Sequence, residues 1–303
     1  MHDHGHTHVR TDDATRLTLA LALILALMGA EVVAGILADS LALLSDAAHM
    51  LTDAGAIALA LFAARLARRP AHGGFTFGFR RAEILSAQLN GATLVALAVV
   101  IVVEGVRRLI DPPEVEGLVV LLVALAGIAI NLAATMVLAG ADRRSLNVEG
   151  AFQHVLTDLF AFIATAIAGA VVLATDFSRA DGIAALSVAA LMLRSGFALL
   201  RDSGRVLLEA SPRNLDPAEI GRVLAEQNHV VEVHDLHVWE VTSGFPAISA
   251  HVTVGAGCDT RAHRRELAEL LSARFGVTHS TLQVETRHEG PLTIEPLKRG
   301  SEA

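Results

Sequence analysis

The chain has 303 residues, of which 53% are hydrophobic and 18% are charged, and its formal net charge is −8. Its mean hydropathy of +0.51 is well above that of an ordinary soluble enzyme. The acidic balance leaves no basic patch for nucleic acid, so we expect no nucleic-acid partner. The single cysteine, Cys258, excludes an internal disulfide and any zinc motif built from cysteines.

Apolar segments follow one another through the first two thirds of the chain, each close to the ~20 residues that cross about 30 Å of hydrocarbon. The first is too long, and too closely followed by the second, to be a cleaved signal peptide. The sequence therefore predicts an α-helical membrane protein with six transmembrane helices over residues 15–204, after a disordered, His-rich tail at 1–14. The predicted spans are residues 17–38, 41–64, 82–106, 115–139, 148–174 and 180–200.

Arginines near the span ends gather on one side of the predicted bilayer. Arg68 and Arg69, Arg80 and Arg81, and Arg143 and Arg144 fall on that side, whereas few arginines flank the other. Positively charged loops stay in the cytoplasm, so we expect both termini to be cytoplasmic. The short loops favour a multi-pass protein of a bacterial inner membrane.

The polar residues after the last span predict a small cytoplasmic domain over 205–290, with a second disordered tail at 291–303. Asp216-Pro217 is typical of a helix start, and Gly276 of a helix end. Alternating apolar residues predict strands on either side of a turn at 243–246. The expected α+β order is αββαβ, from elements at 216–227, 234–242, 247–254, 260–275 and 281–286.

Two copies of one pattern lie inside the predicted spans: His49-x-x-x-Asp53 and His154-x-x-x-Asp158. This spacing puts an imidazole and a carboxylate on one helical face, one turn apart. Together the pairs supply two nitrogens and two oxygens, a set that suits tetrahedral Zn²⁺. An ionisable side chain at mid-membrane costs at least ~2.5–3.5 kcal/mol and is functional by default. The pattern therefore predicts a membrane transporter of divalent metal.

The same ligands predict exchange of metal against protons. A metal ion needs neutral imidazoles and ionised carboxylates, so protons and Zn²⁺ compete for the same atoms. An imidazole titrates near neutral pH, at about 6.5. We expect the site to load zinc from the cytoplasm and to release it outside as protons arrive, with rocking helices giving alternating access.

Four stretches, at residues 40–53, 76–85, 147–158 and 234–239, resemble the signature motifs of the cation diffusion facilitators. The resemblance extends over residues 15–290. It implies a homodimeric metal/proton antiporter with six spans and a ferredoxin-like, metallochaperone-like cytoplasmic domain. It also implies that the transported ion, zinc and often cadmium, binds at four residues: His49, Asp53, His154 and Asp158.

The resemblance further implies a second, regulatory zinc site in the cytoplasmic domain, formed by His234, His251, His279 and Glu285. The alternative is that these side chains only pack or face solvent. Some relatives bind metal in the loop after the second span, but phenylalanines occupy those positions here, so we expect no site in that loop.

Other functions remain open at this stage. A membrane-anchored zinc sensor would use the cytoplasmic site without transport, and Cd²⁺, Co²⁺ or Ni²⁺ could replace Zn²⁺ as main substrate because they share its ligands. An intramembrane metallohydrolase would need an open coordination position and a general base. The chain has no HExxH motif, so we expect it not to be an enzyme.

Overall fold

The structure, a computed structural model, describes residues 7–37, 41–112, 117–175, 177 and 179–286. The predicted tail at 291–303 and the first six residues of the predicted N-terminal tail lie outside these ranges. Within them, some side chains are also not described, among them those of His49 and Asp53. The chain divides into two compact units, one formed by residues 1–210 with 240–244 and the other by 211–239 with 245–303.

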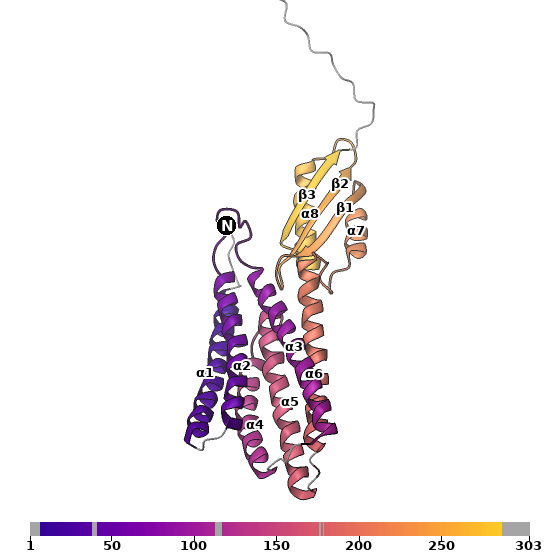
Figure 1. Cartoon of the computed structure of the whole chain (residues 1–303). Helices are drawn as coiled ribbons and strands as arrows, with labels where there is room; N and C mark the ends of the chain where they lie inside the picture. The colour runs from indigo at the N-terminus through magenta and orange to yellow at the C-terminus, as the bar shows by residue number, and fades with distance from the viewer. Residues whose placement is uncertain (1–6, 38–40, 113–116, 176, 178, 287–303) are drawn as a thin grey trace, which may run out of the picture. The chain divides into compact units, whose positions relative to one another are not determined.

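The first unit is built from long helices, shown as coiled ribbons in Figure 1. Five of them have described segments long and apolar enough to cross a membrane; for α2 the described apolar stretch is the shorter Ala54–Ala67. The prediction of a helical membrane region is thus confirmed. The helices are α1 (Thr7–Leu37), α2 (Leu41–Ala67), α3 (Ala82–Ile110), α4 (Gly117–Ala139), α5 (Leu146–Thr175) and α6 (Arg179–Leu207).

Two helices extend beyond the apolar segments that predicted them. α1 begins at Thr7, so residues 7–14 are helical where a disordered tail was expected. α6 continues to Leu207, past the expected end at residue 200, and buries Val206. Hydropathy marks only the stretch that suits hydrocarbon, whereas a helix continues as long as its backbone groups stay bonded and no proline interrupts it.

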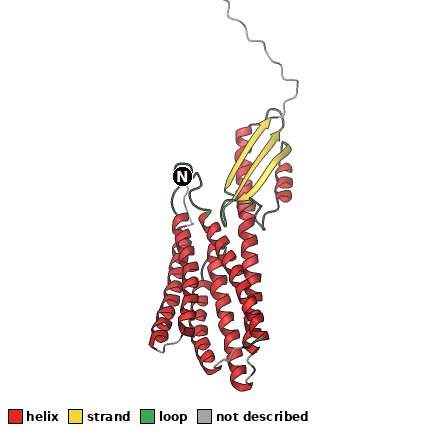
Figure 2. Ribbon diagram, viewed as in Figure 1, coloured by secondary structure: helices red, strands yellow, loops and turns green. Residues whose placement is uncertain are grey.

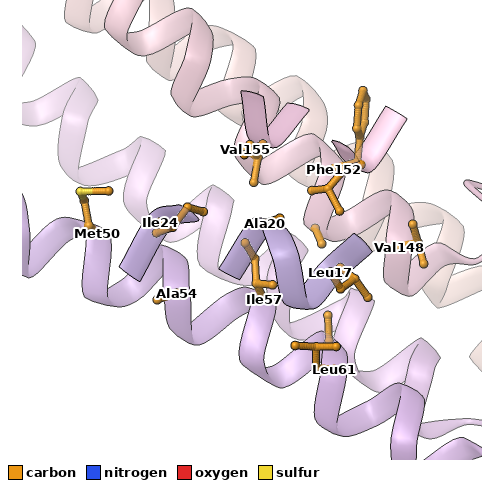
Figure 3. Close-up of a cluster of buried hydrophobic side chains, with 14 of the residues drawn as sticks. Leu17, Ala20, Ile24, Met50, Ala54, Ile57, Leu61, Val148, Phe152 and Val155 are labelled. Atoms are coloured by element: carbon orange, nitrogen blue, oxygen red, sulfur yellow. The ribbon is translucent and has the colours of Figure 1, made fainter. Parts of the chain in front are cut away.

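Helices α1, α2, α4 and α5 share one apolar core. Close-packed side chains from three of these helices are visible in Figure 3, where Ile24 of α1, Ile57 of α2 and Val155 of α5 lie in the same cluster. Leu138 adds a contribution from α4. All four side chains are essentially inaccessible, so this core holds the four helices together by dispersion and close packing, the forces that associate helices in lipid.

Helices α3 and α6 instead approach each other through glycines. A Cβ added at Gly91 would lie 3.1 Å from the carbonyl oxygen of Gly196, and one added at Gly182 would lie 3.1 Å from that of Gly105. The two contacts are fourteen residues apart along each helix, or about 21 Å at the helical rise. The two backbones therefore touch at two levels, as small residues permit in membrane helices.

The glycine contacts predict a specific sensitivity. In Gly196→Ala the new methyl group would lie 2.8 Å from Cγ2 of Val95 and 3.0 Å from the Gly91 carbonyl oxygen, so α3 and α6 must separate. We expect the variant to lose about 1–3 kcal/mol of stability, seen as a lower melting temperature in circular dichroism of the purified protein.

The matched control is Gly29→Ala on α1, where nothing lies within 4 Å of the new methyl group. Because alanine favours helix over glycine by up to ~1 kcal/mol, this variant should be neutral or more stable. Equal melting temperatures for the two variants would show that the α3–α6 contact is not tight.

The second unit has the predicted αββαβ order, drawn in red and yellow in Figure 2. Its sheet has the order β1-β2-β3, and β2 and β3 are parallel, joined through α8. Asp216 and Asp259 cap the two helices by accepting backbone N–H groups, and Gly276 ends α8 with φ +68°. The elements are α7 (Pro217–Ala225), β1 (Val230–Glu240), β2 (Pro246–Val254), α8 (Thr260–Phe275) and β3 (His279–Thr286).

One face of this sheet is covered by the helices and the other is open. Ile220 of α7 and Leu271 of α8 pack with Ile248 and Val252 of β2 in a single buried cluster. Residues that alternate with the buried ones, such as His251, are partly or fully exposed. The sheet therefore presents a polar face on which side chains can gather without displacing the core.

Candidate metal transport site

His154 and Asp158 lie one turn apart on α5, inside a helix apolar enough to cross a membrane. Nε2 of His154 is 3.9 Å from Oδ2 of Asp158. The histidine is 1% exposed, and the aspartate side chain keeps 20% of its surface accessible. At the helical rise, His154 is ~12 Å and Asp158 ~18 Å from the start of α5, so both lie well inside the helix.

The face of α5 that carries this pair is held against α2. Asn147, two turns before His154 on the same face, donates a hydrogen bond from Nδ2 to the carbonyl oxygen of Ala60 at 2.8 Å. Val155 and Ala151 pack with Ala54 in the shared core. The α5 pair therefore faces the interior of the bundle because apolar contacts on one flank and one polar contact fix the rotation of the helix.

The other predicted pair, His49 and Asp53, lies on α2, one helical turn apart. The side chains of both residues are outside what the structure describes, so their approach to the α5 pair stays a prediction. The residues that follow them in the sequence, Met50 and Ala54, are buried in the core of the first unit (Figure 3). Met50 and Ala54 thus pack one side of this part of α2 against the core.

A polar network precedes the α5 pair along the helix. Gln153 donates to Glu149 at 2.6 Å and accepts a 3.4 Å hydrogen bond from Ser195 of α6. Glu149 also pairs with Arg143 at 2.7 Å, and this hydrogen bond raises the pKa of the Arg143 guanidinium. Sequence analysis missed this network, although the i, i+4 spacing of Glu149 and Gln153 was a visible signal.

In the second unit, four of the polar side chains on the open face of the sheet come together. The ring centroids of His234 and His251 are 5.3 Å apart. Asp235 reaches two histidines, with Oδ1 at 3.0 Å from Nε2 of His237 and Oδ2 at 3.9 Å from Nε2 of His251. One carboxylate and several imidazoles thus share this patch, a donor set that suits zinc.

Asp235 could not be placed on this face from the sequence, because strict alternation puts it opposite His234. The residue adopts φ +52°, and both His234 and Asp235 are exposed while Val233 and Leu236 pack on the core. Two successive residues on one face are the mark of a β-bulge, which re-aims a side chain.

The two remaining predicted ligands lie at opposite ends of β3. In the parallel register of β2 and β3, Glu285 lies opposite Thr253 and His279 lies opposite Ala247. His251 lies opposite Gln283. Glu285 is therefore a diagonal neighbour of His251, and its carboxylate accepts a hydrogen bond from Gln283. His279 is four residues away along the ladder, or ~13 Å, and its ring lies beside Phe245 instead. The structure does not bring His279 to the other three.

Among the side chains that the structure describes, no group of three or more His, Cys, Asp or Glu is arranged to hold a metal ion. In the first unit the predicted site draws on two helices, and only the side chains of its α5 half are among those described. In the second unit, His234 and His251 lie close together, and the remaining ligands would have to come from Asp235 or Glu285.

A bundle of apolar helices with a buried imidazole–carboxylate pair, followed by a small αββαβ domain, defines a multi-pass membrane protein that handles metal ions. Residues 17–208 match the cation efflux transmembrane domain, and residues 212–287 match the cytoplasmic domain of cation efflux proteins. The chain therefore belongs to the cation efflux family.

Full-length relatives are similar over nearly the whole chain. A cadmium, cobalt and zinc/H⁺-K⁺ antiporter of Bacillus velezensis is 36% identical over 93% of this chain and 92% of its own length. The zinc transporter ZitB of Escherichia coli is 38% identical over 94% and 92%. The solved metal-bound C-terminal domain of the CzcD transporter from Cupriavidus metallidurans is 32% identical, with a TM-score of 0.23, over 23% of this chain and 99% of that one.

The geometry of the open sheet face predicts which histidines of the second unit bind zinc. In a full-length Asp158→Ala background, which removes a predicted ligand of the candidate transport site, His234→Ala and His251→Ala should each weaken zinc binding by tenfold or more. Competition of the purified protein with a chelating zinc indicator measures this.

His279→Ala is the matched control, because its ring lies beside Phe245 and away from His251. We expect it to leave zinc affinity within about twofold of the background protein. A loss of zinc affinity as large as that of His251→Ala would mean that His279 binds the metal together with His251.

Proposed function

We propose that this protein exports a divalent metal cation, zinc in the first place, from the cytoplasm in exchange for protons, by alternating access to a site between α2 and α5. The observation that carries the proposal is the pair of a buried His154 and a largely buried Asp158 inside an apolar helix. An ionisable pair at this depth costs several kcal/mol, and metal binding gives it a physical role.

The hydrogen bond from Asn147 to Ala60 supports a four-residue site, because it sets the level of α5 against the antiparallel α2. Positions can be counted from this contact into the bundle, forward along α5 and backward along α2. After seven residues the count reaches His154 on α5 and Asp53 on α2. Eleven residues in lie Asp158 and His49. Equal numbers of residues give equal rise along each helix, ~10 Å and ~16 Å. Each histidine is therefore level with the aspartate of the other helix.

Two imidazoles and two carboxylates at these levels would complete a tetrahedral shell for Zn²⁺. The two aspartates would cancel the double charge of the ion, which matters where little water screens it. Four protein ligands also leave no open position for an attacking water, so this arrangement suits transport rather than hydrolysis. The names of the relatives, which include zinc, cadmium and cobalt transporters, support the same substrate class.

The remaining parts of the proposal concern assembly and placement. The match of residues 212–287 to the cytoplasmic domain of cation efflux proteins supports a cytoplasmic second unit that pairs in a homodimer. The arginines at the end of α2 and just before the start of α3 support the same orientation. In the second unit the patch at His234, Asp235 and His251 would bind zinc in a regulatory role. We infer a bacterial inner membrane from the short connections and the bacterial relatives.

The test is flux in sealed vesicles that contain the purified protein. Zinc and pH indicators are read in the same vesicles after a zinc gradient is imposed, and only an antiporter moves zinc and protons in opposite directions. Asp158→Ala removes an anionic ligand, so we expect both fluxes to fall by about a hundredfold or more.

The control is Glu104→Ala, which removes a carboxylate that pairs with Arg108 at 3.2 Å on the exposed surface of α3. It should transport at the rate of the unaltered protein, since exposed pairs contribute little. Zinc binding without any flux in the unaltered protein would favour the sensor function. Normal flux in Asp158→Ala would refute the transport site.

The proposal also predicts how zinc affinity depends on pH. Each proton displaced by the metal lowers apparent affinity about tenfold per pH unit below the pKa of that ligand. We expect affinity to fall steeply between pH 7.5 and 5.5, where imidazoles take up protons. Titration calorimetry at several pH values measures it, and a flat profile would exclude competition between protons and zinc.

A further inference from the structure

The first turn of α5 carries a buried polar atom that nothing in the described part of the chain satisfies. Asn147 is 1% exposed. Its Nδ2 donates to the Ala60 carbonyl oxygen, but its Oδ1 has no hydrogen-bond partner among the described residues. Asn147 lies on the same helical face as His154, two turns nearer to the start of the helix.

Helix α3 adds two more such atoms beside this face. Asn90 and Ser86 are one turn apart and are 2% and 3% exposed. Nδ2 of Asn90 and Oγ of Ser86 likewise have no partner within the described residues. A Cβ added at Gly150, between Asn147 and His154 on α5, would lie 3.5 Å from Nδ2 of Asn90. The two helices therefore bring these polar groups to one region of the bundle.

Not every buried amide among the described residues has an atom without a partner. Asn131 of α4 is buried to the same degree, yet its Nδ2 donates to the carbonyl oxygen of Gly127 in its own helix at 3.1 Å. Ser203 of α6 is satisfied in the same way by Leu199. The donors of Ser86 and Asn90 could have turned to a backbone carbonyl, and all three residues, Asn147 included, could have been replaced by apolar ones. Their common position therefore needs its own explanation.

Ordered water would satisfy all of these atoms. Buried polar groups that lack protein partners are typically satisfied by water molecules with two to four hydrogen bonds each. Asn147 is ~10 Å from His154 along α5, a distance that a short chain of water molecules can bridge. The polar atoms lie at the end of the bundle where α3 and α5 begin, so such a chain would lead from that end toward the metal site.

We propose that Ser86, Asn90 and Asn147 line a hydrated route between α3 and α5, through which an aqueous divalent cation reaches His154. This proposal rests on the proposed function, since it supplies the cytoplasmic access to that transport site. The amide and hydroxyl groups exchange hydrogen bonds with the water that the ion carries. The ion thereby enters partly hydrated, and its last water molecules are replaced only by the ligands of the site.

Water accessibility is the direct test. Ser86→Cys is nearly isosteric, and in a Cys258→Ser background it is the only thiol of the chain. We expect a membrane-impermeant, cationic methanethiosulfonate reagent, added to protein in lipid vesicles, to modify it. The control is Leu89→Cys, at the same depth of α3 but on its exposed outer surface, where lipid keeps a thiol from ionising.

Flux measurements give an independent test. Ser86→Ala and Asn90→Leu remove polar atoms that bond no described residue, so in a dry bundle they should keep or raise the melting temperature and leave flux unchanged. With a hydrated route, zinc flux should fall by roughly tenfold, as expected when water-mediated hydrogen bonds are lost. Equilibrium zinc affinity should stay the same. Asn131→Leu, the same change at a satisfied amide, should transport at the unaltered rate.

Modification of Ser86→Cys but not of Leu89→Cys, together with slowed flux, supports the route. An unreactive Ser86→Cys would overturn the proposed route, and so would unchanged flux in both Ser86→Ala and Asn90→Leu. The thiol measurement tests the route even where Asn90→Leu fails to fold. Failure of the proposed function looks different, because the unaltered protein would then move no zinc while the thiol at position 86 still reacted.

Discussion

The first unit depends on one constraint: an imidazole and a carboxylate, His154 and Asp158, are held inside a helix that is otherwise fit for hydrocarbon. Lipid cannot solvate either group, so each must face the protein interior or water. The rotation of α5 follows from this requirement. Asn147 bonds α2, and apolar residues on one flank of α5 fill the core shared with α1, α2 and α4.

The helices of the first unit form two groups, α1 with α2, α4 and α5, and α3 with α6, which pack by different means. The core shared by α1, α2, α4 and α5 is made of interlocking aliphatic side chains, in which Ile57 and Val155 are completely buried. Such a core fixes the separation of helices through side-chain volume. The α3–α6 pair has glycines where its backbones meet, so its spacing is set by the main chain itself. The candidate site belongs to the first of these groups.

Much of this architecture could be predicted from the sequence because hydrophobic length is a strong signal in membranes. The predicted helical membrane region and the αββαβ order after it are borne out by the family matches and by the helices and strands. The ends of α1 and α6 could not be predicted, because polar helix carries no hydropathy signal. The glycine contacts were also hidden, since small residues occur throughout the spans and only three-dimensional structure shows which of them touch.

The sites were predictable to different degrees. The i, i+4 spacing of His154 and Asp158 is a local property of one helix, and the sequence alone placed them on one face. The second unit shows the limit of this reasoning, since the bulge at Asp235 and the pairing of His279 with Ala247 depend on strand register. Register is set by contacts distant in the sequence. A resemblance to a family therefore identified ligand candidates there without placing them together.

The paired glycines have a mechanical consequence. Two rods that touch at one point can pivot about it, but rods joined at two levels cannot tilt against each other without opening a gap at one of them. The two contacts between α3 and α6 are about 21 Å apart. We therefore expect this pair of helices to move as one rigid body. Relative motion of the helices in the membrane unit is therefore expected at the contacts between aliphatic side chains, as in the core shared by α1, α2, α4 and α5.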